Sequence, residues 1–285
     1  MSDDSSALAG TEVHYLASQC VGDEYKIFIG HCGDDGTTPV PVLYLTDANG
    51  MFGLTVDIVR GMQLSRHLPP MVVVGVGYRG GGLAETQAIR TRDLTPSDSP
   101  DYAQLFREPP LMGGAEAFSS FIRQELQPWV DGHYCVDPTD AAYFGHSLGG
   151  LFGAYLLFTT PQMFGRYILG SPSLWWDDQT IFNLERSYAA AHDNLEATVF
   201  FGIGADETRE GRQREAANLS ERAKTHATAW SMDMVADMKK MVAALRARQY
   251  AALTMSETVF PDEFHVSVAP LSLSRGLRAV FGAPR

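Results

Sequence analysis

Residues 145–149 read Gly-His-Ser-Leu-Gly, a G-x-S-x-G pentapeptide that constrains the fold of this chain more than any other feature. A short apolar stretch, 141–144, precedes it, and an apolar stretch with helical character, 150–157, follows it. Strand, sharp turn and helix in this order form the context in which the motif presents a serine above the end of a sheet. The flanking positions require glycine because a Cβ would collide within so tight a turn. We therefore interpret Ser147 as a candidate nucleophile.

Apolar stretches with strand character alternate with helical patterns along the chain. This alternation predicts an α/β fold with a mostly parallel, twisted central sheet and helices on both faces. Residues 40–46 and 71–78 are rich in β-branched side chains, as expected for strands that are covered on both faces. An antiparallel hairpin is expected from 11–17 and 25–30. Further strands are expected at 166–169, 197–201 and 253–259, and helices at 118–130 and 271–281.

Two segments interrupt the regular pattern, although residues 1–285 contain no linker or repeat and are predicted to form a single domain. Residues 79–112 are rich in Gly, Pro, Asp and Thr and are predicted to be an irregular loop region over the active-site face. Residues 206–249 begin with a charged stretch and continue with methionines at helical spacing. Two interpretations of the second segment remain open, namely surface helices or a mobile lid with a methionine-lined acyl pocket.

The amino-acid composition limits which partners and which cellular location are expected. The chain has 22 Lys and Arg against 34 Asp and Glu, a net charge of −12, which argues against nucleic-acid and anionic-membrane partners. It has no apolar run long enough to span a bilayer, and the polar, acidic start at 1–6 does not resemble a signal peptide. Cys20, Cys32 and Cys135 lack the spacing of a zinc site or a disulfide framework. We expect reduced thiols, a cytoplasmic protein, and no metal or other cofactor.

A serine hydroxyl needs a positioned base to accept its proton. Three histidines follow Ser147 in the chain. His192 and His226 lie in polar helical stretches, where a solvated histidine is expected. His265 comes directly after the last predicted strand, where sequences with the G-x-S-x-G turn carry their histidine. The position predicts His265 as the general base.

The acid that orients such a histidine is expected after the preceding strand, 197–201. Asp206 and Glu207 both follow that strand, and because they are adjacent only one of them can face the imidazole. Spacing alone does not choose between them. Asp262 and Glu263 are weaker candidates, since they share a loop with His265.

An oxyanion hole needs two backbone N–H groups directed at the oxygen on which negative charge develops. The residue after the nucleophile, Leu148, is expected to supply one. The turn after the strand at 40–46 is expected to supply the other, with Asn49 as the first candidate and Gly50 as the second.

Several motifs beyond the pentapeptide resemble those of one family. They are Pro-Val-Leu-Tyr-Leu-Thr-Asp at 41–47, Arg-Asp-Leu-Thr-Pro at 92–96, Gly-Gly-Ala at 113–115, 145–150, and Gly-Ser-Pro-Ser-Leu-Trp-Trp at 170–176. From about residue 11 to 281 the chain resembles the putative-esterase family of α/β-hydrolases, which includes esterase D and the enterochelin esterases, and it is most similar to the trilactone-siderophore esterase type. The resemblance implies an α/β-hydrolase fold with Ser147 as nucleophile and His265 as base. It also implies Glu207 as the acid in preference to Asp206.

The chain departs from that family at two places. Ala48 stands where the family usually has glycine, and the charged stretch 206–224 does not match closely. Few basic residues lie near the motifs, so we do not adopt an anionic ferric siderophore as the expected substrate. Trp175 and Trp176 are predicted to be packing residues, with a pocket wall formed by one of them as the alternative.

Together these features predict a serine carboxylic-ester hydrolase that acts on small soluble esters through an acyl-enzyme intermediate. An acyltransferase or a thioester hydrolase resembling S-formylglutathione hydrolase would use the same three residues. A siderophore-ester hydrolase is a further alternative. A non-catalytic binding protein is disfavoured because serine, histidine and acid are all present.

Overall fold

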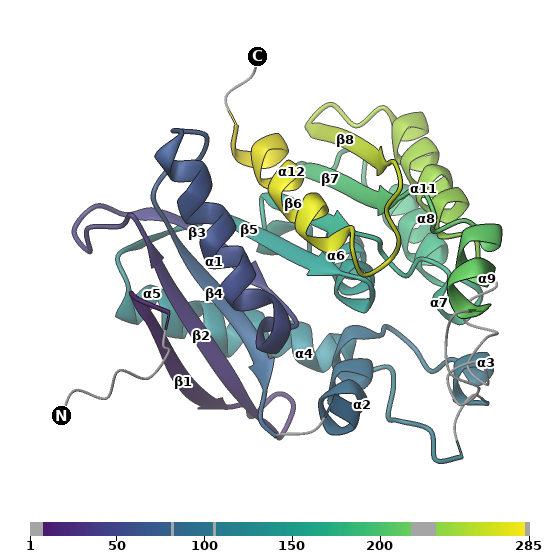
Figure 1. The fold of residues 1–285 in the computed structure, drawn as a ribbon, viewed down its shortest axis with the longest axis horizontal. Helices are drawn as coiled ribbons and strands as arrows, with labels where there is room; N and C mark the ends of the chain where they lie inside the picture. Colours follow the sequence, from purple (N-terminus) through teal and green to yellow (C-terminus); the bar gives the residue numbers. More distant parts are fainter. Residues whose placement is uncertain (1–7, 81–82, 105–106, 218–231, 283–285) are drawn as a thin grey trace.

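A computed structural model describes residues 8–80, 83–104, 107–217 and 232–282 (Figure 1). One sheet of eight strands runs through the described residues in the order β1-β2-β4-β3-β5-β6-β7-β8. The strands are β1 (Thr11–Ala17), β2 (Glu24–Cys32), β3 (Val40–Leu45), β4 (Met71–Tyr78), β5 (Val136–His146), β6 (Arg166–Gly170), β7 (Ala197–Gly204) and β8 (Leu253–Phe260).

The sheet is antiparallel at one edge and parallel elsewhere. β1 pairs antiparallel with β2, with Thr11 opposite Gly30, which confirms the predicted hairpin. β2 pairs antiparallel with β4, and every pair from β4 through to β8 is parallel. All eight residues of β4 are buried, as the β-branched run predicted. The predicted α/β class is confirmed.

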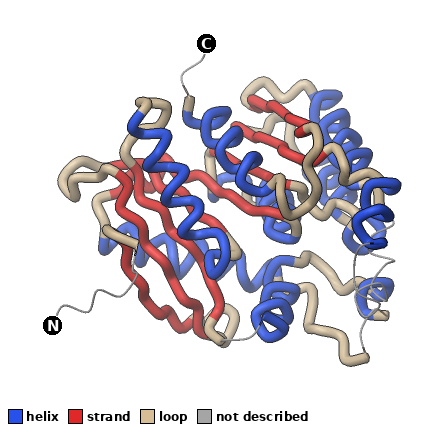
Figure 2. The backbone as a smooth tube through the Cα atoms, viewed as in Figure 1, coloured by secondary structure: helices blue, strands red, loops and turns tan. Residues whose placement is uncertain are grey.

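Helices cover both faces of the sheet (Figure 2). One face carries α1 (Ala48–Leu64) and α12 (Ala269–Phe281), which contact each other. The other face carries α4 (Ala115–Phe121), a π-helical segment (Ile122–Leu126), α5 (Gln127–His133), α6 (Leu148–Thr159), α8 (Ile181–Ala191) and α11 (Met234–Arg248). The remaining helical elements are α2 (Leu83–Leu94), α3 (Pro100–Ala103), a 3₁₀ turn (Pro161–Met163), α7 (Trp176–Gln179) and α9 (Arg209–Ala217).

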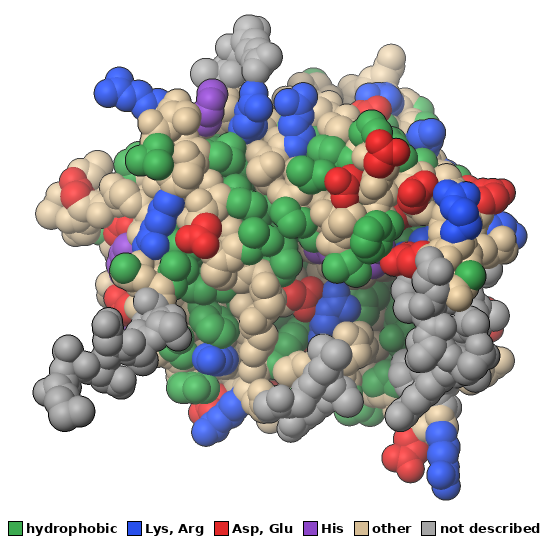
Figure 3. Space-filling view, in the orientation of Figure 1, with side chains coloured by type: hydrophobic (Ala, Val, Ile, Leu, Met, Phe, Trp, Pro, Cys, Tyr) green, Lys and Arg blue, Asp and Glu red, His purple; other side chains and the backbone are tan. Residues whose placement is uncertain are grey.

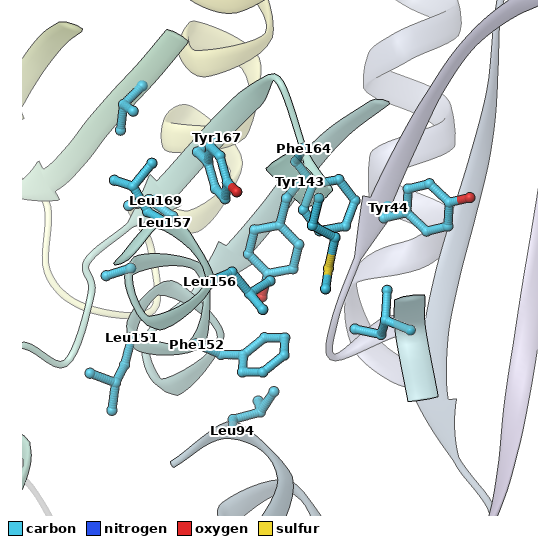
Figure 4. Packing of buried hydrophobic residues seen from close by; sticks show 14 of the residues in the cluster. Tyr44, Leu94, Tyr143, Leu151, Phe152, Leu156, Leu157, Phe164, Tyr167 and Leu169 are labelled. Atoms are coloured by element: carbon cyan, nitrogen blue, oxygen red, sulfur yellow. The ribbon is translucent and has the colours of Figure 1, made fainter. Parts of the chain in front are cut away.

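Aromatic packing fixes the joint between β5 and α6 (Figure 4). The Tyr143 ring lies 5.6 Å from Phe164 and 6.1 Å from Phe152 between ring centroids. The hydroxyl of Tyr143 donates to the carbonyl of Gly149 at 2.7 Å, so this buried phenol is satisfied within the turn itself. The turn that carries Ser147 is therefore held by the core on both sides.

The segment 79–112, predicted to be irregular, contains helices α2 and α3. The prediction missed α2 because polar groups, more than an apolar stripe, attach this helix to the fold. Asp93 is 1% exposed, accepts a hydrogen bond from the Tyr25 hydroxyl at 2.8 Å and pairs with Arg92 at 2.7 Å. A helix held by such contacts has no hydrophobic periodicity to detect.

The segment 206–249 forms surface helices where it is described, namely α9 and α11. Met234, Met238 and Met241 are at most 1% exposed and belong to the apolar core against the sheet. The methionines therefore do not line an acyl pocket, which corrects that part of the lid interpretation. The remainder of the lid interpretation depends on 218–231, which lie outside the described residues.

Two further expectations concern cysteines and membrane segments. Cys20, Cys32 and Cys135 are all free thiols. Within the described ranges no helix combines the length and apolar character needed to cross a bilayer. The residues at 1–6, on which the signal-peptide prediction depends, lie outside those ranges.

The buried carboxyl of Asp237 on α11 gives a testable stability effect. Burial raises its pKa to about 6 despite the opposing charge of Lys240, and Gln179 donates to it at 2.7 Å. Because the folded pKa lies above the unfolded value, ionisation of Asp237 removes stability as the pH rises through about 6. We expect Asp237→Asn to stabilise the protein by about 1 kcal/mol at pH 8, after allowance for solvent screening, and much less at pH 4.5. Urea unfolding at the two pH values measures this, with Asp57→Asn, at an exposed position of α1, as the control. Equal effects at both pH values would contradict it.

Candidate active site

The turn between β5 and α6 holds Ser147 in a backbone conformation that side chains rarely adopt, with φ 62° and ψ −118°. A Cβ at Gly145 would lie 2.2 Å from the carbonyl oxygen of Gly149, and one at Gly149 would lie 2.5 Å from the Thr46 hydroxyl. Only glycine fits at either position. The N–H of Ser147 donates to Gly170 at 2.9 Å, which ties the turn to the end of β6. The motif thus forms the strand–turn–helix that the sequence predicted.

Ser147, His265 and Glu207 form one line of hydrogen bonds. His265 Nε2 lies 2.9 Å from Ser147 Oγ, and His265 Nδ1 lies 2.6 Å from Glu207 Oε2. An ionised carboxylate can only accept, so the proton of a neutral imidazole sits on Nδ1 and the Nε2 lone pair faces the serine hydroxyl. This is the tautomer that a general base requires.

The Glu207 carboxylate is fully buried and fully bonded. It is 0% exposed, and its second oxygen accepts from the Ser171 hydroxyl at 2.6 Å and from the Gly204 N–H at 2.9 Å. Burial works against ionisation of Glu207. Its hydrogen bond and charge interaction with His265, followed by the bonds from Ser171 and Gly204, outweigh burial and hold the pKa of this carboxyl below its usual range. The group therefore stays a carboxylate.

The other carboxyl candidates point elsewhere. Asp206 pairs with Arg214 at 3.1 Å and its side chain is half exposed. Glu263 accepts from the Ser267 hydroxyl, and Asp262 lies exposed at a left-handed turn with φ 59°. Neither bonds to His265 among the described contacts. The structure thus brings Glu207 to the histidine, as the family resemblance implied.

The loops after β7 and β8 hold the acid and the histidine together. The N–H of Ala205 donates to Phe260 at 2.8 Å, and that of Asp206 donates to Glu263 at 3.0 Å. A Cβ at Gly204 would lie 2.3 Å from the carbonyl oxygen of Glu263, so the close approach of the two loops requires glycine there. These contacts hold the loop that carries His265 beside the loop that carries Glu207.

The predicted oxyanion donors lie at two helix N-termini that meet at the same sheet edge. Leu148 is the first residue of α6, and Asn49 is the second residue of α1. First-turn N–H groups have no partner within their helix. The N–H of Gly50, however, donates to Asp47 at 3.1 Å, which disfavours Gly50 as a donor. The Asn49 side chain is fixed by two bonds to the backbone of Tyr78, at 3.0 and 2.7 Å, so the start of α1 is rigid.

Several known proteins similar to this chain are esterases. The sequence model of the esterase family, described as "Putative esterase", matches residues 18–250. The chain belongs to this family. The esterase is 31% identical to the ferri-bacillibactin esterase of Bacillus subtilis, over 95% of this chain and 89% of that protein. It is 29% identical to the siderophore triacetylfusarinine C esterase of Aspergillus fumigatus, over 96% and 94%.

Solved structures agree as well. The esterase superposes on the BES protein from Bacillus cereus with a TM-score of 0.79 and 28% identity, covering 97% of each chain. The α/β-hydrolase fold is thereby confirmed, and the protein is an enzyme that hydrolyses carboxylic esters as a serine hydrolase.

Sequence reasoning missed Arg90, which connects three parts of the esterase's site. Its guanidinium holds both carboxylate oxygens of Asp47, at 2.6 and 3.0 Å, and donates to the His146 carbonyl at 3.3 Å. The backbone of Asp47, directly before α1, is in the left-handed conformation, with φ 58°. Arg90 thus fixes the loop after β3 to the serine turn. The position of Arg90 in the sequence does not indicate these contacts.

His146, next to the serine, was also missed. Its ring lies 4.8 Å from the His265 ring between centroids. Burial, followed by the nearby His265, lowers the pKa of His146 to about 3. The ring therefore stays neutral when His265 carries charge, and two cations do not meet in the site.

The two tryptophans of the 170–176 motif differ in their surroundings. Trp176 is 0% exposed and its indole N–H donates to the Ser97 carbonyl at 3.0 Å. Trp175 is half-buried beside it, with 5.9 Å between ring centroids. Both rings also lie beside Tyr102 of α3, at 6.5 Å for Trp175 and 4.9 Å for Trp176 between ring centroids, in line with the prediction of packing residues.

Proposed function

We propose that Ser147, His265 and Glu207 are the nucleophile, the general base and the orienting acid of this esterase. The continuous line of hydrogen bonds from Ser147 Oγ to Glu207 Oε2 carries the proposal, because each group faces the next in the protonation state that its role requires. We propose the N–H groups of Leu148 and Asn49 as the oxyanion donors. The backbone of α1 and α6 keeps both groups in place at rigid helix ends.

The proposed reaction runs in two halves. Ser147 Oγ attacks the ester carbonyl while His265 Nε2 takes its proton, and the tetrahedral oxyanion accepts from the two N–H groups. The C–O bond then breaks, and the imidazolium gives its proton to the departing alcohol, which leaves an acyl-serine. Water then attacks this acyl group while His265 takes its proton. The bond between the acyl carbon and Ser147 Oγ breaks, the imidazolium returns the proton to Oγ, and the carboxylic acid is released. Glu207 orients the ring and stabilises the imidazolium without taking its proton.

A serine-directed fluorophosphonate tests the nucleophile directly. We expect one equivalent to add to the peptide that contains Ser147, with loss of activity in step with labelling. Mass spectrometry of a digest measures the site. Labelling of any other serine in step with inactivation would contradict the assignment.

We propose small soluble esters as the substrates, with siderophore esters as the second candidate. The siderophore class is retained because relatives at 31% and 29% identity, matched over nearly the whole chain, are named as siderophore esterases. At the described site, Arg90 is paired with Asp47, so this cation is already engaged. A compact neutral ester needs no free cation, which is why small esters stay the first candidate.

A substrate panel distinguishes the two classes. It contains p-nitrophenyl esters of increasing acyl length together with bacillibactin and triacetylfusarinine C, each with and without iron. A kcat/KM for a siderophore at least tenfold above that of every simple ester would assign the siderophore class. The reverse order supports small soluble esters.

Acyl transfer and thioester hydrolysis use the same residues and stay alternatives. Adding an alcohol acceptor and measuring how product divides between acid and new ester separates transfer from hydrolysis. A cytoplasmic location is also a proposal, supported by the three free thiols, which suit a reducing compartment.

A further inference from the structure

A groove of about 430 Å³ lies away from Ser147, between β8, the last turns of α12 and the turn after α1. Figure 3 shows basic side chains gathered at the top of the view, over the ends of these two helices. The lining residues are Arg66, His67, Phe200, Ser256, Glu257, Thr258, Arg275, Arg278, Ala279 and Gly282. The volume is within the range typical of small-molecule sites.

No acidic side chain among the described residues offsets the positive charge of the arginines in this groove. Arg66, Arg275 and Arg278 form no ion pair within the part of the chain that the structure describes. The one carboxylate on the lining, that of Glu257, is held by Arg246 of α11 at 2.7 and 2.8 Å. Three unpaired guanidinium groups around one groove stand out in a chain whose net charge is −12.

The backbone at Arg66 adds an independent observation. Arg66 follows the end of α1 in the left-handed conformation, with φ 56°. Its N–H donates to Gln63 at 2.9 Å, and that of His67 donates to Met62 at 3.0 Å, which is the hydrogen-bond pattern of a Schellman motif. Glycine is the residue that such a position favours, so arginine there lowers stability. A side chain kept at a cost in stability, and placed on the groove, points to a use for its charge.

The rest of the lining suits a small organic molecule. Ser256 and Thr258 lie two residues apart on β8, so their hydroxyls share one face of the strand. Phe200 is buried at the base and supplies an apolar surface. Guanidinium groups bind phosphate and carboxylate through paired N–H donors. We propose that this groove binds a small anion carrying two or more phosphate or carboxylate groups.

This groove is separate from the esterase site. His265 precedes the first residue of α12, whereas Arg278 lies in its last turn and Gly282 just beyond its end, about 14 and 20 Å along the helix axis from that first residue. Binding at the groove can therefore be measured without reference to ester hydrolysis. The inference stands whether or not Ser147 is the nucleophile.

Isothermal titration calorimetry with pyrophosphate and with citrate tests the proposal. It also shows whether the groove prefers an anion with phosphate groups or one with carboxylate groups. Acetate at the same ionic strength is the control ligand. We expect binding of at least one of the two polyanions and none of acetate. We expect Arg275→Gln and Arg278→Gln each to weaken that binding about tenfold, as loss of one charge-assisted contact implies. Arg186→Gln, an exposed arginine on α8 across the sheet, is the matched control and should bind as the wild type does.

Arg66→Gly separates a ligand role from a structural one. We expect this variant to melt about 2–4 °C higher, because glycine suits the left-handed position, and yet to bind the polyanion more weakly. Esterase rates should be unchanged in all groove variants. No binding of either polyanion at millimolar concentration, or equal affinities in Arg275→Gln and Arg186→Gln, would overturn the proposal.

Discussion

Ser147→Ala is expected to lower kcat/KM for ester hydrolysis by at least about three orders of magnitude, or roughly 4 kcal/mol of transition-state stabilisation. Oγ is the only non-hydrogen atom removed, and His265 Nε2 lies 2.9 Å from it. The turn itself should be unaffected, because Gly145 and Gly149 make it possible and alanine keeps the Cβ of serine. A continuous p-nitrophenyl acetate assay measures the loss.

Two controls accompany this variant. Its free energy of unfolding in urea should agree with that of the wild type within about 1 kcal/mol, which excludes misfolding as the cause of lost activity. The fluorophosphonate should leave it unlabelled. Activity within tenfold of the wild type would show that another group attacks the ester.

Glu207→Gln is expected to lower kcat by about two to four orders of magnitude. A glutamine amide that turns its NH₂ group toward His265 Nδ1 forces the proton of the ring onto Nε2. The ring can then no longer accept the proton of Ser147. The Ser171 hydroxyl and the Gly204 N–H, which both donate to Oε1, favour the amide orientation that turns NH₂ toward the histidine.

Asp206→Asn is the matched control, because it makes the same chemical change at the neighbouring residue. Asp206 is half exposed and pairs only with Arg214 among the described contacts, so we expect kcat within about twofold of the wild type. The reverse ranking of the two variants would assign the acid role to Asp206. Equal, small effects would indicate that the serine and histidine work without an acid.

Strands that are apolar throughout were predictable, and polar stretches of regular structure were not. The run at 71–78 coincides with β4, because a strand buried on both faces must be apolar throughout. β5 begins at Val136, five residues before the predicted start, since its first part is a polar Asp-Pro-Thr-Asp stretch with two exposed residues. α2 was missed for the related reason that Asp93 and Arg92 attach it through charge.

Some residues of the candidate site could likewise be predicted from the sequence, and others could not. Ser147 and His265 could be placed from a local motif and from chain order, because the sheet brings the ends of its parallel strands to one edge. Asp206 and Glu207 could not be separated by spacing, since the choice depends on which side chain turns into the core. Arg90 depends on contacts across more than forty positions of the chain, which no local pattern records.

The conformation at residue 147 has an evolutionary consequence. Holding a serine at φ 62° and ψ −118° costs about 1–3 kcal/mol, which the surrounding core must offset. A descendant freed from selection for hydrolysis would gain stability simply by replacing this residue with glycine. With Ser147 as the proposed nucleophile, part of the stability of the fold is given up to hold a reactive oxygen at this turn.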